Sequence, residues 1–338
     1  MRRMFGAVIA MALLSGCTGS KTGSGGFTQP VQAASPPTLA QTVAAGGVVT
    51  LPSGVTQVDC TSQLVISKDT KLEGTGSGTI ISDSCPSGDT ILVTAGDVEI
   101  SRLTIQRNAT AGNGIRFTGD LAPIPNNPAP NGPGIDSLTQ KLVMRSVVVT
   151  GAYNGLMSDG GHNLLSVYES VFKKNVNDGA VIGSFGVTMH ANWFSANNHN
   201  GVTFVKAGFC AECMGNEYWS NGNHGIEYSS ALGNIDPRHI GEYVDSNGST
   251  GLIIDGFVRD FAFLDGWVGG NVGTGMIVTD TIWGTVITGN TFVNNTGQSL
   301  IVTETSAPLR VSNNISSVSH SPTCDATING QCVDLNKQ

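Results

Sequence analysis

Four ionisable residues in the second half of the chain have the types that proton-transfer chemistry on a sugar acid requires. They are Glu227, Asp236, Arg238 and His239. A carboxylate or an imidazole can remove the proton beside a carboxyl group, and a guanidinium can neutralise the negative charge that develops. Two carboxylic acids at a defined separation could instead hydrolyse a glycosidic bond. We therefore predict that these four are catalytic, with solvated turn residues as the alternative.

Four further polar residues occupy nearby positions and could bind the substrate. They are Asp159, Lys206, His224 and Asp255. We predict that they line the outward face between Asp159 and Asp255, with a place in a structural turn column as the alternative for His224. No cluster of carboxylates demands a metal ion, so we assign no metal ligand and no cofactor.

A repeat of about 24 residues positions these side chains. Each copy places an Asn four residues before a Gly, and the Gly opens a short strand of alternating polarity. The asparagines are Asn175, Asn197, Asn221, Asn247, Asn271 and Asn295, and the glycines are Gly179, Gly201, Gly225, Gly251 and Gly275, with Ser299 in the last copy. Three strands and three turns fit within one repeat, which predicts an all-β parallel β-helix. We expect the asparagines to adopt the left-handed conformation and to hydrogen-bond from rung to rung as a ladder.

Two further columns follow from the same period. An aromatic position precedes the Gly by seven or eight residues and should point into the core, where its rings would stack between rungs. Its members are Phe172, Phe194, Tyr218, Tyr243 and Phe292, with Val268 in one coil. A second turn column lies two residues before the aromatic position and comprises Ser170, Asn192, Asn216, Gly241, Gly266 and Asn290.

The segments that depart from the repeat indicate where function would lie. Insertions at 119–137 and 229–239 should rise from the same side of the coils and could wall a groove. The second residue after the Gly should face outward, where Ile253, Ile277 and Ile301 form an apolar stripe. The C-terminal tail, a protein partner or a second copy of the chain would have to cover that stripe.

Six of the seven cysteines fit disulfide bonds. The expected pairs are Cys60–Cys85, Cys210–Cys213 and Cys324–Cys332. The first two partners are one repeat apart and should lie on neighbouring rungs, and the last pair should staple the C-terminal segment. The middle pair has a spacing that also suits a metal or redox site, but no second cysteine pair accompanies it, which favours a local disulfide.

The N-terminal segment 1–17 has the features of a targeting signal. A basic start and an apolar stretch lead into Leu-Ser-Gly-Cys, which resembles the bacterial lipoprotein signal and implies lipidation of Cys17. An ordinary secretory peptide is the alternative. We therefore predict a flexible tether at 18–37, a β-helix with a short cap helix at 38–319 and a tail at 320–338, anchored by lipid in the bacterial envelope, with the outer membrane favoured.

Composition excludes one class of partner. The net charge is −8, only 12% of the residues are charged, and the basic residues are scattered. Nucleic-acid binding needs a concentrated basic surface, so we expect no nucleic-acid partner.

The repeat over residues 38–319 resembles the pectate-lyase-like superfamily of right-handed parallel β-helices. Segment 44–54, Ala-Ala-Gly-Gly-Val-Val-Thr-Leu-Pro-Ser-Gly, is similar to the opening of that fold, where a cap helix leads into the first rung. Members include pectate lyases, polygalacturonases, alginate-modifying epimerases and lyases, phage tailspikes and non-catalytic surface proteins. Because lyases of this superfamily often use calcium, the resemblance makes calcium a plausible cofactor. The arginine-rich signature of pectate lyases and the paired aspartates of polygalacturonases are absent. Residues 236–239, Asp-Pro-Arg-His, resemble the Asp-Pro-His element of mannuronan C5-epimerases with one residue inserted.

Two functional hypotheses follow. The resemblance and the acid–base residues favour an envelope-anchored protein that binds or modifies an acidic polysaccharide, as a lyase, an epimerase or a hydrolase. The apolar stripe and the incomplete activity motifs favour a non-catalytic structural or interaction lipoprotein. Fold alone does not decide between them.

Overall fold

The computed structural model describes residues 36–108, 110–118, 140–161, 163–206, 208–229, 234–256, 258–279, 281–303, 308–317 and 324–337. The predicted signal segment with Cys17, most of the predicted tether and the 119–137 insertion lie outside this set. From Pro37 onward the chain forms one compact unit. Among the described residues, no helix is both long enough and apolar enough to cross a membrane.

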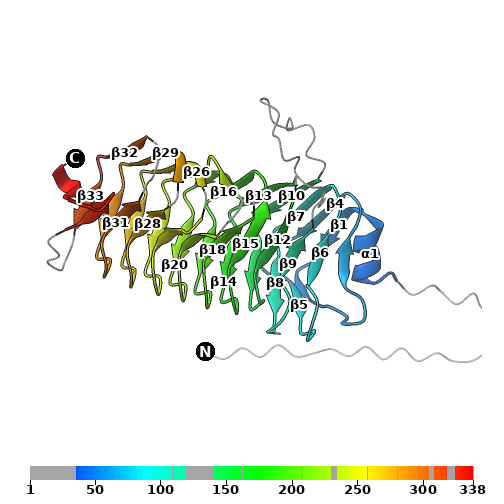
Figure 1. Cartoon of the computed structure of the whole chain (residues 1–338). Coiled ribbons are helices and arrows are strands. Elements are labelled where there is room, and N and C mark those ends of the chain that lie inside the picture. Colours follow the sequence, from blue (N-terminus) through cyan, green and yellow to red (C-terminus); the bar gives the residue numbers. More distant parts are fainter. Residues whose placement is uncertain are drawn as a thin grey trace, which may run out of the picture. The chain divides into compact units, whose positions relative to one another are not determined.

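The chain winds through three parallel sheets, so that each rung contributes one strand to each sheet (Figure 1). We name the sheets A, B and C after the order in which the chain first enters them. Successive rungs are separated by about 24 residues, as in the pairing of Gly47 with Thr70 and of Thr291 with Ile315. The structure is therefore an all-β parallel β-helix, which confirms the prediction from the repeat.

Sheet A contains β1 (Gly47–Leu51), β4 (Thr70–Gly74), β7 (Asp97–Ser101), β10 (Gln140–Arg145), β13 (Asn163–Tyr168), β16 (Val187–His190), β19 (Cys210–Met214), β23 (Arg238–Ile240), β26 (Val258–Leu264), β29 (Thr281–Thr288) and β32 (Leu309–Ser312), and β22 (Asn234–Ile235) also pairs with β26. Sheet B contains β2 (Gly54–Gln57), β5 (Thr79–Asp83), β8 (Thr104–Arg107), β11 (Val148–Thr150), β14 (Val171–Lys173), β17 (Trp193–Ser195), β20 (Glu217–Trp219), β24 (Tyr243–Asp245), β27 (Trp267–Gly269), β30 (Thr291–Val293) and β33 (Ile315–Ser317). Sheet C contains β3 (Leu64–Ile66), β6 (Ile91–Val93), β9 (Ile115–Phe117), β12 (Leu156–Gly161), β15 (Ala180–Ser184), β18 (Val202–Val205), β21 (Ile226–Ser229), β25 (Leu252–Ile254), β28 (Met276–Thr279), β31 (Leu300–Thr303), β34 (Ala326–Ile328) and β35 (Gln331–Val333).

Asparagine ladders run through two corners of the coils, where a corner is the turn between two strands of one rung. In the first, Asn221 Nδ2 donates to Asn247 Oδ1 at 3.0 Å, and the same bond links every neighbouring pair from Asn175 to Asn295. Asn221 Nδ2 also donates to the Phe194 carbonyl at 3.0 Å, so the amide is buried but satisfied. The ladder prediction is confirmed, and each amide stabilises a turn that would otherwise bury unpaired polar groups.

The left-handed residue of this corner is not the asparagine. It is the preceding residue, for example Ala196 with φ 54° or Ser220 with φ 54°. The prediction that Asn adopts the left-handed conformation is therefore wrong. Asn is required at the next position because its side chain supplies both a donor and an acceptor along the stack.

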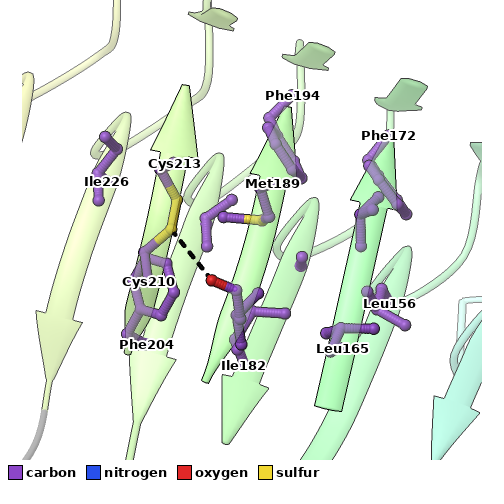
Figure 2. Packing of buried hydrophobic residues seen from close by; sticks show 14 of the residues in the cluster. Leu156, Leu165, Phe172, Ile182, Met189, Phe194, Phe204, Cys210, Cys213 and Ile226 are labelled. Atoms are coloured by element: carbon purple, nitrogen blue, oxygen red, sulfur yellow. Dashed lines mark hydrogen bonds between the residues drawn. A yellow bond between two sulfur atoms is a disulfide. The ribbon is translucent and has the colours of Figure 1, made fainter. Parts of the chain in front are cut away.

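The interior aromatic column is present with one change of residue. Phe172, Phe194 and Tyr218 are fully buried and stack with ring centroids 5.1 and 5.3 Å apart. Figure 2 shows the Phe172 and Phe194 side chains of this column. In the next rung Val244 pairs with Tyr218 and is buried, whereas Tyr243 is 38% exposed. The prediction that Tyr243 is internal is wrong, because it lies eight rather than seven residues before Gly251, and this one-residue offset turns its side chain to the other face.

The same shift changes the second turn column. Glu242, rather than the predicted Gly241, lies below Asn216 and is 1% exposed. Its Oε2 and Oε1 atoms accept from Asn216 N at 2.9 Å and from Asn216 Nδ2 at 3.1 Å. An ionisable residue thus occupies a ladder position inside the coil.

Close approach between rungs explains the glycine column. A Cβ atom on Gly201 would lie 2.5 Å from the Gly225 carbonyl oxygen and 3.0 Å from Asn221 Nδ2. In the last copy Ser299 replaces the Gly, and Ser316 replaces the aromatic residue of the next rung. Their hydroxyl oxygens lie 2.7 Å apart, so the space vacated by the ring accommodates the serine side chain.

Both ends of the stack are covered by local structure. At the first rung, α1 (Leu39–Ala45) begins at the N-cap Thr38 and buries Val43 against the core, which agrees with the predicted cap helix. At the last rung, β34 continues sheet C and β35 folds back on it in antiparallel orientation. Asn336, in the 3₁₀ turn η2 (Leu335–Lys337), accepts from Ser316 N at 3.0 Å and donates to the Ser316 carbonyl at 2.9 Å.

All three predicted disulfides are present. Cys60–Cys85 joins neighbouring rungs, with Cα atoms 5.2 Å apart. Cys210–Cys213 is local to β19 and faces the core (Figure 2). Cys324–Cys332 closes the C-terminal hairpin.

Candidate functional site

The structure separates the four predicted catalytic residues into three environments. Asp236 and Arg238 are exposed on the outer side of sheet A. His239 follows Arg238 in β23 but is fully buried, because consecutive residues of a strand face opposite sides. Glu227 lies in β21 of sheet C. The predicted set therefore does not converge, and only Asp236 and Arg238 share a surface.

His239 belongs to a polar network in the core. Its Nε2 lies 2.7 Å from Tyr228 Oη, and its Nδ1 lies 3.7 Å from Glu242 Oε1. Burial raises the pKa of Glu242, and the His239 and Asn216 side chains counteract that rise. With both side chains fully enclosed, His239 cannot touch a substrate, and its predicted catalytic role is not supported by its position.

The one described group of potential metal ligands is part of this network. Donor atoms of Cys213, His239 and Glu242 lie within 4.8 Å of one another. The Cys213 sulfur is already bonded to Cys210, and all three residues are buried. The group is therefore suited to a structural role in the core.

A cleft of about 670 Å³ lies on the outer face of sheet A. Its lining comprises Asp236, Arg238, Ile240, Asp260, Phe261, Ala262, Leu264, Gly284, Val286, Pro308, Leu309 and Arg310. These residues come from β23, β26, β29 and β32 and from the turns that precede them. Apolar side chains form most of the wall, and two acids and two arginines supply the polar groups, which is the usual make-up of a ligand site.

The two acids of the cleft form a carboxyl pair. Partial burial raises the pKa of Asp236, and a hydrogen bond and charge repulsion from Asp260 raise it further. The Arg238 and Arg259 guanidiniums act in the opposite direction. Desolvation and a neighbouring acid both disfavour the charged form, so the Asp236 carboxyl group holds its proton to a higher pH than an ordinary aspartate.

Local backbone irregularity places these acids. Asp236 has φ 50° and Asp260 has φ 47°, both in the left-handed region. The register between β26 and β29 shifts at Asp260, which marks a bulge. A bulge re-aims the side chain that it carries, and bulges are common beside functional sites. In the following rung Gly284 leaves room for the Asp260 side chain, since a Cβ atom there would lie 3.2 Å from Asp260 Oδ1.

The arginines mark the two ends of the cleft. Arg238, Ala262, Val286 and Arg310 are partners in successive rungs of sheet A. Three rung spacings separate the two arginines, or about 14 Å at the usual strand separation. A chain lying across the rungs could therefore place one anionic group near each guanidinium, with the acid pair close to the first.

The remaining predicted residues lie on sheet C or beside it. Asp159 Oδ2 accepts from Arg116 Nε at 2.8 Å, and the Asp159 carbonyl accepts from Lys206 Nζ at 2.9 Å. Asp159 and Lys206 are thus brought together. Asp255 follows β25, stands apart from them and is exposed.

His224 and Glu227 form part of a turn column. The chain of contacts runs from Asn154 to Asp178, Asn200 and His224, with Asn200 N donating to Asp178 Oδ1 at 2.9 Å and His224 N to Asn200 Oδ1 at 2.9 Å. Glu227 accepts from Asn200 Nδ2. Burial lowers the pKa of His224, while the Thr250 carbonyl and Glu227 counteract that shift. This supports the structural alternative for His224.

Sequence reasoning missed two members of the cleft. Asp260 lies 24 residues after Asp236, and Arg310 lies 72 residues, or three repeats, after Arg238. Projecting each candidate residue by whole repeats would have found both. It also missed an exposed aromatic surface on sheet B, where three tryptophans stand beside the interior column.

Comparison with known proteins adds information on the fold. No family model matches the sequence, and no curated protein matches it. The A-module of the mannuronan C-5 epimerase AlgE6 from Azotobacter vinelandii superimposes with a TM-score of 0.54 at 18% identity, over 85% of this chain and 92% of that chain. The A-module of AlgE4 from the same organism gives 0.52 at 18% identity, over 83% and 93%. The Dettilon tailspike protein gp208 gives 0.53 at 12% identity, over 83% of this chain and 64% of that one.

These similarities agree with the fold derived from the repeat. At such low identity they show a shared parallel β-helix and no shared activity. The function of the sheet A cleft is therefore inferred from the residues that line it.

Proposed function

We propose that the protein binds an acidic polysaccharide in the sheet A cleft and that the Asp236–Asp260 pair transfers protons to and from the bound sugar. The carboxyl pair, held beside arginines in a concave site, carries this proposal. Arg238 and Arg310 would bind sugar carboxylates, because a guanidinium matches a carboxylate in charge and geometry. That two structural neighbours are named mannuronan C-5 epimerases supports the choice of substrate class.

The carboxyl pair suits elimination or epimerisation better than hydrolysis. Asp236, whose pKa is raised, can donate a proton as an acid, and the second carboxylate of the pair can serve as the base. Glycoside hydrolysis by two carboxylic acids needs them about 5 Å apart or more. Asp260 lies near enough to Asp236 to raise the pKa of its carboxyl group, which favours a shorter separation than hydrolysis needs. An arginine beside the sugar carboxylate would stabilise the carbanion formed when the C5 proton leaves.

Purified protein incubated with alginate or pectate tests this function. Elimination would produce unsaturated uronates, detected by ultraviolet absorbance, and epimerisation would change the uronate signals in the proton NMR spectrum. Asp236→Asn should abolish either product while leaving polysaccharide binding in place. Absence of both products and of binding on both substrates would reject the proposal.

We also propose that the protein is a lipoprotein of the bacterial envelope, held in the outer membrane by lipid on Cys17. The Leu-Ser-Gly-Cys sequence at 14–17 supports this. Mass spectrometry of the mature N-terminus should find a diacylglyceryl-modified cysteine, and Cys17→Ala should release the protein from the membrane fraction. An unmodified N-terminus at another residue would contradict the anchor.

A second candidate function rests on the apolar stripe of sheet C. Ile253, Ile277 and Ile301 are partners in successive rungs and are half-buried. Within the described part of the tail, residues 324–337, Thr327 of β34 pairs with Ile301 and extends the same sheet rather than crossing the stripe. The stripe is thus available for self-association or a protein partner. Sedimentation velocity should show an oligomer that Ile277→Asp dissociates; a monomer at every concentration would exclude self-association.

A further inference from the structure

A row of exposed aromatic side chains crosses the outer face of sheet B. Trp193 is 51% exposed, Trp219 is 50%, and Tyr243 and Trp267 are each 38%. Trp193, Tyr243 and Trp267 occupy one column of the sheet, with Glu217 between the first two. Trp219 lies two residues further along its strand, beside Asp245 of the next rung. We call these four rings the aromatic platform.

The platform includes two adjoining hollows. Glu217, Trp219, Tyr243 and Asp245 line a hollow of about 310 Å³. Trp193, Ser195, Glu217 and Trp219 line another of about 120 Å³. Glu217 and Trp219 belong to both, so the depression continues over three rungs. This face is separate from the cleft, which lies on sheet A.

Contacts within the platform hold Tyr243 and Trp267 in place. Tyr243 and Trp267 are parallel within 11°, with centroids 6.1 Å apart. Tyr243 Oη donates to Asp245 Oδ2 at 3.2 Å. The Trp267 indole covers Gly269, where a Cβ atom would lie 2.7 Å from Trp267 Nε1. A fixed aromatic surface loses little conformational entropy when a ligand covers it.

The charges of the platform restrict its ligand. Glu217 and Asp245 form no ion pair with any residue that the structure describes, and their negative charge raises the pKa of the Tyr243 hydroxyl together with burial. An acidic sugar chain would be repelled by these carboxylates. A chain with hydroxyl or amino groups could instead donate hydrogen bonds to them, while the apolar faces of its sugar rings cover the tryptophans.

The size of the platform argues against a second copy of the chain. Four aromatic side chains about half exposed present on the order of 400 Å². A stable protein–protein interface buries about 800 Å² on each partner. Rings repeated on successive rungs, about 4.8 Å apart, suit a linear ligand with a repeat of similar length, as an extended glycan has.

We propose that the aromatic platform is a second carbohydrate-binding surface, specific for a non-acidic polysaccharide whose sugar rings stack on Trp193, Trp219 and Tyr243 and whose hydroxyl or amino groups bond to Glu217 and Asp245. The inference does not depend on the function proposed for the sheet A cleft. The two surfaces would let one molecule hold two chemically different glycans.

Affinity electrophoresis of the purified full-length protein tests the proposal. Gels would contain mixed-linkage β-glucan or xyloglucan as neutral probes, glycol chitosan as an amino probe, and alginate or pectate as acidic probes. At least one non-acidic probe should retard the protein. The double variant Trp219→Ala, Tyr243→Ala should have an affinity for that probe about tenfold lower, seen as weaker retardation. Quenching of tryptophan fluorescence by soluble oligosaccharides of the same probe gives an independent reading.

Two controls separate the possible outcomes. Ile315→Ala removes an exposed apolar side chain from the same sheet outside the platform and should have no effect. Arg238→Ala should leave binding of the non-acidic probe unchanged, which distinguishes failure of the platform from failure of the cleft. No retardation by the neutral and amino probes, retardation that survives the double substitution, or a dimer that the double substitution dissociates would each overturn the proposal.

Discussion

The outer faces of sheets A and B are built on the same rungs but present different surfaces. Sheet A carries left-handed residues at Asp236 and Asp260 and a register shift beside β29, and there the surface is hollowed and polar groups converge. No register shift occurs in sheet B, where three-residue strands align from β11 to β33 and the rings form an open platform. A register shift thus accompanies the acid pair, whereas strands in regular register accompany the aromatic platform.

The largest expected effect separates the two faces by activity. Asp236→Asn should lower the rate of product formation from alginate or pectate by about a hundredfold to ten-thousandfold, because it removes a group that exchanges a proton with the sugar. Binding of non-acidic glycans to the platform should not change. Asp255→Asn is the matched control, since Asp255 is exposed and stands apart from the cleft. Equal losses in the two variants would show that the cleft is not the site of reaction.

A substitution in the shared core should affect both faces together. Asn221→Ala removes the bonds to Asn247 and Phe194 and leaves the Asn197 amide without its acceptor. The free energy of unfolding in urea should fall by about 2–3 kcal/mol. Asn223→Ala is the control, because Asn223 is outside the ladder and its amide makes only a 3.3 Å contact with His199. If the free energy of unfolding fell equally in the two variants, the hydrogen bonds of the ladder would not be the cause of the loss.

The arginines should distinguish the faces by charge. Arg238→Ala with Arg310→Ala should weaken alginate binding about tenfold at low salt, with a smaller difference at high salt because screening weakens exposed ion pairs. Fluorescence polarisation of a labelled oligoalginate measures this. Arg102→Ala, which removes an exposed arginine paired with Glu73, should leave the affinity unchanged. A salt-independent loss would point to a packing role for the two cleft arginines.

The smallest predicted effect concerns the core beneath the cleft. The folded-state pKa of Glu242 is raised above its ordinary value of 4.5 by burial. Over the pH range between the two values the folded state holds a proton that the unfolded state has released, so stability should fall as pH rises through the raised pKa. Glu242→Gln cannot ionise and should remove this slope, which urea titrations at several pH values would measure. If the slope of stability against pH were unchanged in this variant, a group other than Glu242 would cause the pH dependence.

The 24-residue repeat allowed the scaffold to be predicted from the sequence. Positions that depart from the repeat were predicted less well, and the candidate site lies among them. The ladder, the glycine column and Phe172 to Tyr218 follow from spacing alone, because each rung repeats the contacts of the one before. Tyr243 was misplaced because it is one residue away from the column position, and an offset of one residue reverses the direction of a side chain. The same alternation moved His239 into the core while leaving Arg238 outside.

The cleft itself depends on features that periodicity does not describe. Nothing in the residue types of Asp236 and Asp260 predicts that both adopt a left-handed backbone, although the 24-residue spacing between them does predict that they are neighbours. The platform could have been found in the sequence, since tryptophan is rare in the chain and three of its four copies flank the interior column. A strand that alternates inside and outside predicts that those neighbours are exposed.

The last rung has a consequence for how the protein behaves at high concentration. A stack of parallel strands exposes unpaired backbone groups at its end, which other chains could join to form fibres. Here β35 occupies the edge of sheet C in the opposite direction, and the Asn336 amide occupies both backbone groups of Ser316 on sheet B. Polymerisation through that end would first require these contacts to break. The C-terminal hairpin, stapled by its disulfide, and the Asn336 amide thus oppose the addition of another chain to sheets B and C at this end.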